Sequence, residues 1–296
     1  MELSANTPLW QAARTLLEVR VDDLFCRWDR AVDSRGLDDI HDLRVSSRRM
    51  REGLLLFAPV YPPDTVRRAA KRVKRVTMLL GEQRNLDEAL LFFTGLHREI
   101  GPSCHGCLAV VIADLEAQRE GALDAMAAGL VRIDCRWLQR RLLRIVRFPC
   151  LLTAPLETVD PFAPVATFAR QSLIERCAGL PALVAIASRE DEADAQHRLR
   201  IAVKHLRYRV EMLSFLFGSR YDGLHAALKR YQDLLGTLHD LDVFAGMVNG
   251  RGLPTHDLQT VIAAIAGRRR QTFAAFRKEI DETPLAAICE TLRSSL

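Results

Sequence analysis

The segment His41-Asp-Leu-Arg44-Val-Ser-Ser-Arg48-Arg-Met-Arg51 has a counterpart 156 residues later, His197-Arg-Leu-Arg200-Ile-Ala-Val-Lys204-His-Leu-Arg207. A second pair follows in the same order, Leu80-Gly-Glu-Gln-Arg-Asn-Leu-Asp87 and Leu235-Gly-Thr-Leu-His-Asp-Leu-Asp242, 155 residues apart. A basic pair precedes each glycine motif in register, Lys74-Arg75 and Lys229-Arg230. Matched segments in one order predict an internal duplication of a helical unit.

The repeated segment has the periodicity of an amphipathic helix. At 100° per residue, its histidine and three following cations fall within an arc of about 80° in each copy. In the first copy these are His41, Arg44, Arg48 and Arg51, and in the second His197, Arg200, Lys204 and Arg207. Leucines and other apolar residues occupy the opposite side. Each helix is therefore expected to bury one face and to present a cationic stripe on the other.

The cations within each stripe repel one another. A solvated helix face usually alternates Glu with Lys three or four residues apart, whereas here residues at that spacing carry like charges, which costs a few tenths of a kcal/mol per pair. The same cost recurs in both copies, each time behind a histidine. We interpret the stripes as anion-binding surfaces rather than ordinary solvated faces. Arginine predominates, and its planar guanidinium can bind phosphate oxygens with two hydrogen bonds.

Three other segments are also rich in basic residues. They comprise Arg67, Arg68, Lys71, Arg72, Lys74 and Arg75, then Arg132, Arg136, Arg140, Arg144 and Arg147, and finally Arg268, Arg269, Arg270 and Arg277. The second group falls on one helical face.

Helical periodicity runs through nearly the whole chain, so we expect an all-α fold. Glycine and proline clusters separate segments of about 15–30 residues, a length suited to helical bundles. The proline-rich stretch from Phe148 to Pro164 is the best candidate for a boundary. We place the N-terminal half at 1–150 and the C-terminal half at 151–296, packed as a pseudo-symmetric pair within one domain.

The composition limits what the chain can do. Its 296 residues are 49% hydrophobic with a net charge of +5, which argues against both disorder and a uniformly basic, histone-like protein. Seven scattered cysteines suggest a reducing compartment. The N-terminal residues do not resemble a signal peptide, and no long uncharged apolar run occurs. We therefore expect a cytoplasmic protein without membrane spans.

In these two motif pairs the sequence resembles the CHAD family, the conserved histidine α-helical domain. The family pattern H-D-L-R-V-x-x-R-R-x-R, then L-G-x-x-R-D-L-D, matches from His41 and from Leu80, and its C-terminal versions match from His197 and from Leu235. The resemblance implies two helical bundles related by a pseudo-twofold axis, with basic helices lining a central groove or pore. It also implies that the ligand is inorganic polyphosphate, often on polyphosphate granules.

Carried over by position, the resemblance implies twelve contacts with polyphosphate. These are His41, Arg44, Arg48, Arg51, Lys74, Arg75, His197, Arg200, Lys204, Arg207, Lys229 and Arg230. Three positions depart from the pattern: Asn85 replaces an Asp, and His205 and His239 stand where arginine is usual. Their roles stay open, as do the oligomeric state and the preferred chain length. We interpret Asp87 and Asp242 as carboxylates that hold nearby basic side chains in place, or as structural caps.

Other functions have less support in the sequence. Cys104 and Cys107 with His97 and His105 suggest zinc, but a closed site needs four ligands and only one cysteine pair exists. No P-loop, dinucleotide or nucleophile-elbow motif occurs, and the acidic residues form no clear metal cluster, so we expect no cofactor and no enzyme activity. A metal-dependent polyphosphate phosphohydrolase is the enzymatic alternative. Aromatic residues to stack bases are few, which disfavours nucleic acid, although a nucleic-acid or general polyanion binder stays an alternative. A granule scaffold or adaptor that binds other proteins remains the structural alternative.

Overall fold

The computed structural model describes residues 2–34, 36–101, 104–149, 159–249, 251 and 254–296. It is 86% helical without strands in these residues, so the predicted all-α class is confirmed. The N-terminal half contains α1 (Leu9–Ser34), α2 (Leu37–Leu56), α3 (Pro63–Leu79), α4 (Gly81–Glu99), α5 (His105–Val131) and α6 (Cys135–Arg147). The C-terminal half contains α7 (Val165–Cys177), α8 (Leu180–Ala187), α9 (Ala193–Met212), α10 (Tyr221–Asn249), α11 (Thr255–Glu282) and α12 (Leu285–Ser294).

Proline residues determine where several helices begin. Pro63 is the first residue of α3, and Pro164, Pro254 and Pro284 precede α7, α11 and α12. Proline suits these positions because the first turn of a helix leaves its N–H groups without intrahelical partners. The two glycine motifs behave differently: the helix is interrupted at Leu80, between α3 and α4, whereas α10 continues through Gly236. The predicted duplication is compatible with this order of helices and stays a prediction.

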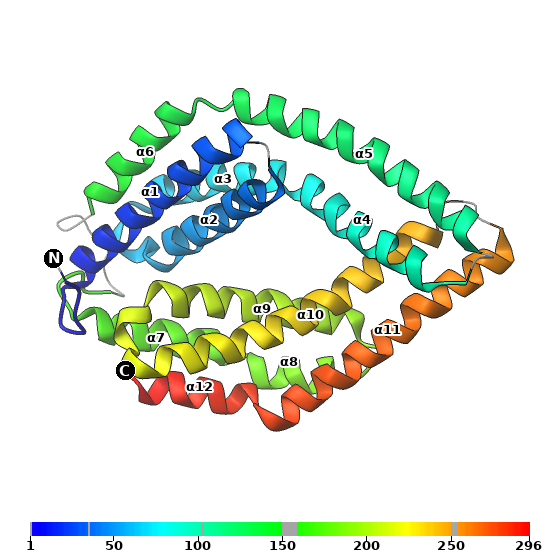
Figure 1. The fold of residues 1–296 in the computed structure, drawn as a ribbon. Helices are drawn as coiled ribbons and strands as arrows, with labels where there is room; N and C mark the ends of the chain where they lie inside the picture. Colours follow the sequence, from blue (N-terminus) through cyan, green and yellow to red (C-terminus); the bar gives the residue numbers. More distant parts are fainter. Residues whose placement is uncertain (1, 35, 102–103, 150–158, 250, 252–253) are drawn as a thin grey trace.

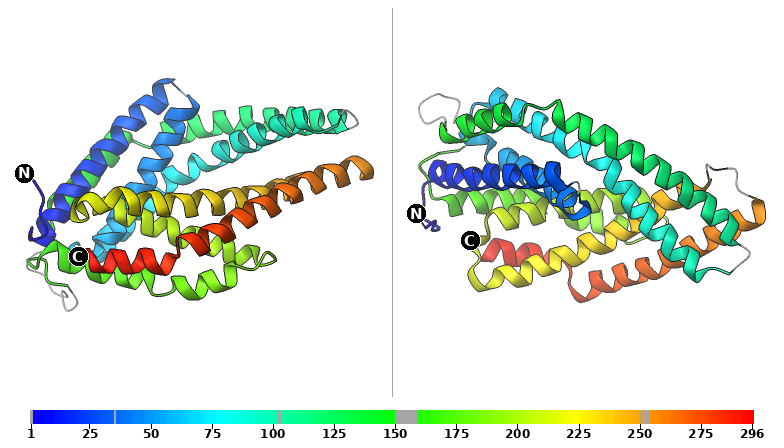
Figure 2. Two further views of the ribbon diagram at one scale, coloured as in Figure 1. Left: turned by 60° about the horizontal axis from the view of Figure 1, so that its bottom comes forward. Right: turned by 45° about the horizontal axis from the view of Figure 1, so that its top comes forward.

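Two long helical hairpins give the molecule its outline. Figure 1 shows α4–α5 and α10–α11 extending from the body that holds both termini and converging at the far end. Figure 2 shows the same hairpins from two other directions. Within the described residues, every helix is too short or too polar to span a bilayer.

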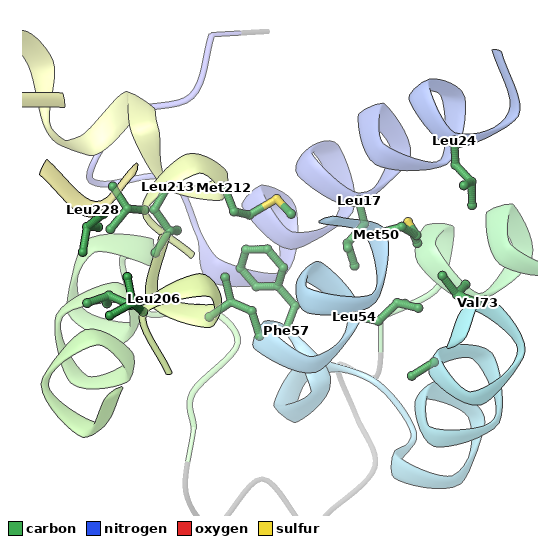
Figure 3. Packing of buried hydrophobic residues seen from close by; sticks show 14 of the residues in the cluster. Leu17, Leu24, Met50, Leu54, Phe57, Val73, Leu206, Met212, Leu213 and Leu228 are labelled. Carbon is green, nitrogen blue, oxygen red and sulfur yellow. The ribbon is translucent and has the colours of Figure 1, made fainter. Parts of the chain in front are cut away.

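The larger hydrophobic core lies in the body and contains side chains from both halves. Figure 3 shows Leu54 and Phe57 of the N-terminal half on one side and Leu206 and Met212 of α9 on the other. Gly53 allows this approach, since a Cβ there would lie 2.7 Å from Met212 Cε.

A second core joins the ends of the two hairpins. It gathers apolar residues of α4, α5, α10 and α11. The rings of Phe92 and Phe244 stack across the two hairpins with centroids 4.6 Å apart. Arg268 on α11 pairs with Glu99 on α4 at the same end. The hairpins are thus fixed at their bases and at their tips, which leaves the space between the two cores for polar residues.

Helices α2 and α9 cross in the body through buried carboxylates. Glu52 of α2 is 2% exposed and accepts hydrogen bonds from Arg209 Nε at 3.0 Å and His205 Nδ1 at 2.6 Å. Burial alone would raise the pKa of Glu52, but the hydrogen bonds and positive charges of His205 and Arg209 outweigh it and hold that pKa below its usual value. In the opposite direction, Glu211 of α9 accepts a 2.8 Å hydrogen bond from Arg49 Nε of α2. His205, whose role the sequence left open, therefore belongs to this crossing.

Replacing Glu52 by Gln should lower the free energy of unfolding at pH 7 by about 3 kcal/mol, because it leaves the buried Arg209 without its counter-charge. A carboxylate whose folded pKa is depressed stabilises above its unfolded pKa and loses that contribution as the pH falls through the folded pKa. The difference from wild type should therefore shrink below about pH 4. Denaturant unfolding across pH measures it, with exposed Glu116→Gln as control. Equal stability of the two variants at pH 7 would contradict this role.

Candidate functional site

A polar pocket of about 350 Å³ lies between the two cores, where α2, α4, α9 and α10 face one another. Its lining contains five Lys or Arg residues, one histidine and three carboxylates. The lining residues are His41, Arg44, Arg48, Arg84, Asn85, Glu88, Arg200, Lys204, Gln232, Asp233, Gly236, Thr237 and Asp240.

The structure brings five of the predicted contacts together in this pocket. His41, Arg44 and Arg48 come from α2, and Arg200 and Lys204 come from α9. They share one side of each helix because their spacings of three and four residues follow the helical period. The apolar sides of α2 and α9 are buried in the large core, so the cationic sides are directed out of it. Two stripes that are remote in sequence thus line one space.

Four other predicted contacts lie outside the pocket, three of them next to α3 and one, His197, near the start of α9. Arg51 and Lys74 line a neighbouring, mainly apolar cavity of about 480 Å³, next to α3. Arg75 lines a further cavity between α3 and α5. His197 lies against His239, with their Nδ1 atoms 3.1 Å apart.

The remaining three lie on α9 and α10. Arg207 is 8% exposed, donates from Nε to Gln232 Oε1 at 2.9 Å, and forms an ion pair with Glu211. On α10, Lys229 is exposed, and Arg230 Nε donates to Glu279 Oε1 at 3.0 Å. None of these three lines the pocket.

The cations in the pocket are close enough to perturb one another. Burial and the charges of Arg48, Arg200, Arg44 and Arg51 lower the pKa of Lys204 to about 8. Burial, Arg48 and Arg84 lower the pKa of Arg44 to about 10. The buried Arg44 Nε atom also has no hydrogen-bond partner among the described residues. The site is therefore short of negative charge and of one hydrogen-bond acceptor, and an anion would supply both.

Burial and the charges of the same cations also lower the pKa values of the histidines near the pocket. Burial and the charge of Arg84 lower the pKa of His41, and burial and Arg200 lower the pKa of both His197 and His239. At neutral pH these rings are therefore mainly neutral in the ligand-free protein. A bound anion would oppose these effects and favour the protonated rings.

The sequence did not identify the opposite wall of the pocket. Arg84, which forms an ion pair with Glu88, and Asn85 come from α4, while Gln232, Asp233, Thr237 and Asp240 come from α10. Helical spacing could have placed the α10 residues on one face, but nothing in the sequence says that this face meets α2. Gly236 of α10 faces α9 here, and a Cβ at this position would lie 3.8 Å from Arg200 Nε, an ordinary van der Waals distance.

The aspartates that end the two glycine motifs hold arginines of the neighbouring helix. Arg119 Nε of α5 donates to Asp87 Oδ1 at 2.7 Å, and Arg269 Nε of α11 donates to Asp242 Oδ1 at 2.6 Å. The interpretation of both residues as carboxylates that position basic side chains is confirmed. One pair joins α4 to α5 and the other joins α10 to α11, so each holds together the two helices of one long hairpin.

Cys104 and Cys107 lie near the histidine pair that suggested zinc. Both cysteines are buried, and His97 stacks on His105 with ring centroids 4.4 Å apart. In the part of the chain that the structure describes, no three or more His, Cys, Asp or Glu side chains are grouped to hold a metal ion.

Comparison with known proteins identifies the family. The CHAD domain model matches residues 15–249, which is most of the chain. The chain belongs to the CHAD family. The match includes both histidine motifs and both glycine motifs, so the predicted resemblance is confirmed.

Two solved structures share the CHAD fold. The crystal structure of the CHAD domain from the plant Ricinus communis is 24% identical, with a TM-score of 0.64 over 99% of this chain and 94% of that one. PptA from Streptomyces chartreusis is 17% identical, with a TM-score of 0.67 over 93% of this chain and 99% of that one. No curated protein matches the chain. At these identities the two structures support the arrangement of helices alone.

Replacing Lys204 by Met should stabilise the ligand-free CHAD domain by about 1–2 kcal/mol at pH 7, because it removes a charge held among like charges. A lysine whose pKa is about 8 in the folded state destabilises fully below pH 8, and this cost fades as the pH rises toward its unfolded value of 10.5. The gain should therefore disappear near pH 10. Denaturant unfolding without anions measures it, and the exposed Lys278→Met is the control. A destabilised Lys204→Met protein would show that the pocket is not self-repelling.

Proposed function

We propose that this protein binds inorganic polyphosphate in the pocket between α2, α4, α9 and α10 without cleaving it. The observation that carries this proposal is the convergence of Arg44, Arg48, Arg84, Arg200 and Lys204 on one small polar space. Membership of the CHAD family supports the choice of ligand, since the family is known for binding polyphosphate. Guanidinium groups suit this ligand because they donate paired hydrogen bonds to phosphate oxygens.

The shape and lining of the pocket favour a thin anion without bases. Its lining includes no Phe, Tyr or Trp on which a nucleobase could stack. Glu88, Asp233 and Asp240 lie on the α4 and α10 side, where their charges restrict the positions that negative charge can occupy, and Glu88 forms an ion pair with Arg84. Burial lowers the pKa of Arg200, for example, and the charge of Asp240 opposes part of this effect.

Binding rather than catalysis fits the groups present. Phosphate transfer to water is usually assisted by metal ions held by carboxylates. The three pocket carboxylates do not form such a group in the described residues. Incubation with long-chain polyphosphate and Mg²⁺ should accordingly release no orthophosphate above a protein-free control. Steady release would replace this proposal by the phosphohydrolase alternative.

Association with polyphosphate granules in the cytoplasm follows from the proposed ligand. Granules present phosphate chains at high local density, and binding to a polyanion recruits a cationic protein. The alternative is a scaffold whose helical faces bind other granule proteins. The two differ in a binding assay with purified components, because only direct binding needs no second protein.

The double variant Arg48→Ala/Lys204→Ala should bind polyphosphate at least tenfold more weakly, because it removes two central cations of the pocket. Titration calorimetry at about 150 mM salt measures the affinity, and circular dichroism checks the helix content. The control Arg170→Ala/Lys278→Ala removes the same charge from exposed positions of α7 and α11. Unchanged affinity of the pocket variant would mean that the stripes are solvated faces.

The same titration with single-stranded DNA as competitor tests the ligand class. At equal total charge, DNA should displace polyphosphate poorly, because it brings bases that the pocket does not accommodate. Equal displacement would make the protein a general polyanion binder.

Polyphosphate affinity should fall as the pH rises above about 8. Lys204 loses its proton near that pH in the free protein, while bound phosphates favour the protonated form. Binding at pH 8.5 should therefore take up protons, which calorimetry in buffers of different ionisation enthalpy detects. Lys204→Arg keeps its charge and should delay the decline toward pH 10, where Arg44 begins to titrate. A decline that is the same in Lys204→Arg would rule out Lys204 as the source.

A further inference from the structure

The positive charge of the chain is concentrated on two helices outside the pocket. Helices α3 and α6 together contain thirty residues, of which eleven are Lys or Arg and one is Asp, a formal charge of +10. The whole chain carries only +5, so the other 266 residues carry −5. No stretch that merely keeps the protein soluble needs such a separation of charge.

Most of these cations have no counter-charge. Among the described residues, only Arg67 and Arg147 of the eleven form an ion pair, with Asp64 and Glu18. Arg68, Arg140 and Arg144 are exposed and unpaired. Elsewhere the exposed faces carry partnered arginines, such as Arg293 with Glu290. The two helices thus present a continuous excess of unneutralised charge.

The two helices lie against each other. Arg72 of α3 stacks over the ring of Trp137 of α6, with the guanidinium carbon 4.5 Å from the ring centroid. The right-hand view of Figure 2 shows α6 beside α3 along the top of the molecule. Their apolar sides are buried in the large core, so the cationic sides are directed outward together. At 1.5 Å per residue they extend for about 25 and 20 Å.

A single residue connects this surface to the pocket. Arg51 follows the pocket residue Arg48 by one turn of α2 and lines the neighbouring cavity with Arg67, Lys71 and Lys74 of α3. The charge of Arg51 also reaches Lys204 in the pocket, where it contributes to the lowered pKa of that lysine. Cations therefore continue from the pocket through Arg51 onto α3 and across to α6. We call Arg51 with the cations of α3 and α6 the outer cationic track.

We propose that the outer cationic track binds the part of a polyphosphate chain that extends beyond the pocket and so makes the protein selective for long chains. This proposal rests on the proposed function and adds a second binding surface to it. The track begins where the pocket ends, so one flexible chain can occupy both, and the second contact is then intramolecular. We therefore expect the affinity of the protein for polyphosphate to increase with chain length until the chain covers α3 and α6.

Other polyanions fit the track less well. The Trp137 ring is covered on one side by Arg72, so it is less available to stack on a nucleobase. The apolar residues Leu138 and Leu142 of α6 are buried, and the helix cannot insert them into a lipid bilayer. Helix α12 of the C-terminal half carries no such excess among its described residues, since it contains one Glu and one Arg, paired with each other. The track therefore extends from one side of the pocket.

The test compares tripolyphosphate, which can occupy the pocket alone, with long-chain polyphosphate, both expressed per phosphate. The variant Arg68→Glu/Arg140→Glu/Arg144→Glu should lose roughly tenfold in affinity for the long chain. Its affinity for tripolyphosphate should stay within about twofold of wild type, because screening weakens the effect of distant charges. The control Arg98→Glu/Arg170→Glu/Arg270→Glu makes the same charge change at exposed positions of α4, α7 and α11 and should keep the long-chain preference. Thermal unfolding checks that all variants are folded.

Each alternative result has one meaning. The track is ruled out if its variant keeps the long-chain preference, or if the control loses as much. If single-stranded DNA shows the same length-dependent gain and the same loss in the track variant, the surface accepts any polyanion and the polyphosphate assignment is wrong. If the pocket variant Arg48→Ala/Lys204→Ala binds tripolyphosphate normally while the track variant loses long chains, the pocket proposal fails and the track stands.

Discussion

The buried crossing of α2 and α9 is the interaction on which the rest of the structure depends. These two helices carry the cationic stripes, and bringing the stripes together costs free energy because their charges repel. Glu52 and Glu211 oppose that repulsion from about one turn beyond the stripes on the same helices, each bonded to a cation of the partner helix. The apolar contacts of the large core act in the same direction. The positive pocket exists because negative charge is buried a few residues away, where no ligand reaches it.

The pocket also depends on the two hydrophobic cores being separate. One core joins α2 and α9 in the body, and the other joins the ends of the long hairpins. The helices between them cannot collapse onto each other without breaking one of these contacts, so polar side chains occupy the space. Asp87 and Asp242 add stiffness by holding Arg119 and Arg269 across each hairpin. A site of unneutralised cations needs such rigid support, since flexible side chains would otherwise move apart.

Sequence reasoning could predict what depends on helical periodicity alone. The all-α class and the shared side of Arg44, Arg48, Arg200 and Lys204 are of this kind. Periodicity does not predict the contacts of a side chain with other helices. Arg51 and Arg207, for example, occupy the same motif position but have different surroundings. Arg51 lines a cavity beside α3, whereas Arg207 pairs with Glu211 one turn further along α9. Glu211 was visible at a spacing of four residues, but the wall contributed by Arg84 and Asp240 depends on tertiary packing that no local pattern encodes.

Charge placement separates the two halves more than their motifs do. A strict duplication would give a symmetric site, with an equal chance for a bound chain to leave on either side. The net charge of +10 on α3 and α6, against none on α12, removes that equivalence. Because a flexible polyanion lowers its free energy by following unpaired cations, it should leave the pocket past Arg51 rather than along α10, where Arg230 is already paired with Glu279. Under the proposed function, this asymmetry would make the small pocket the start of a directional binding surface.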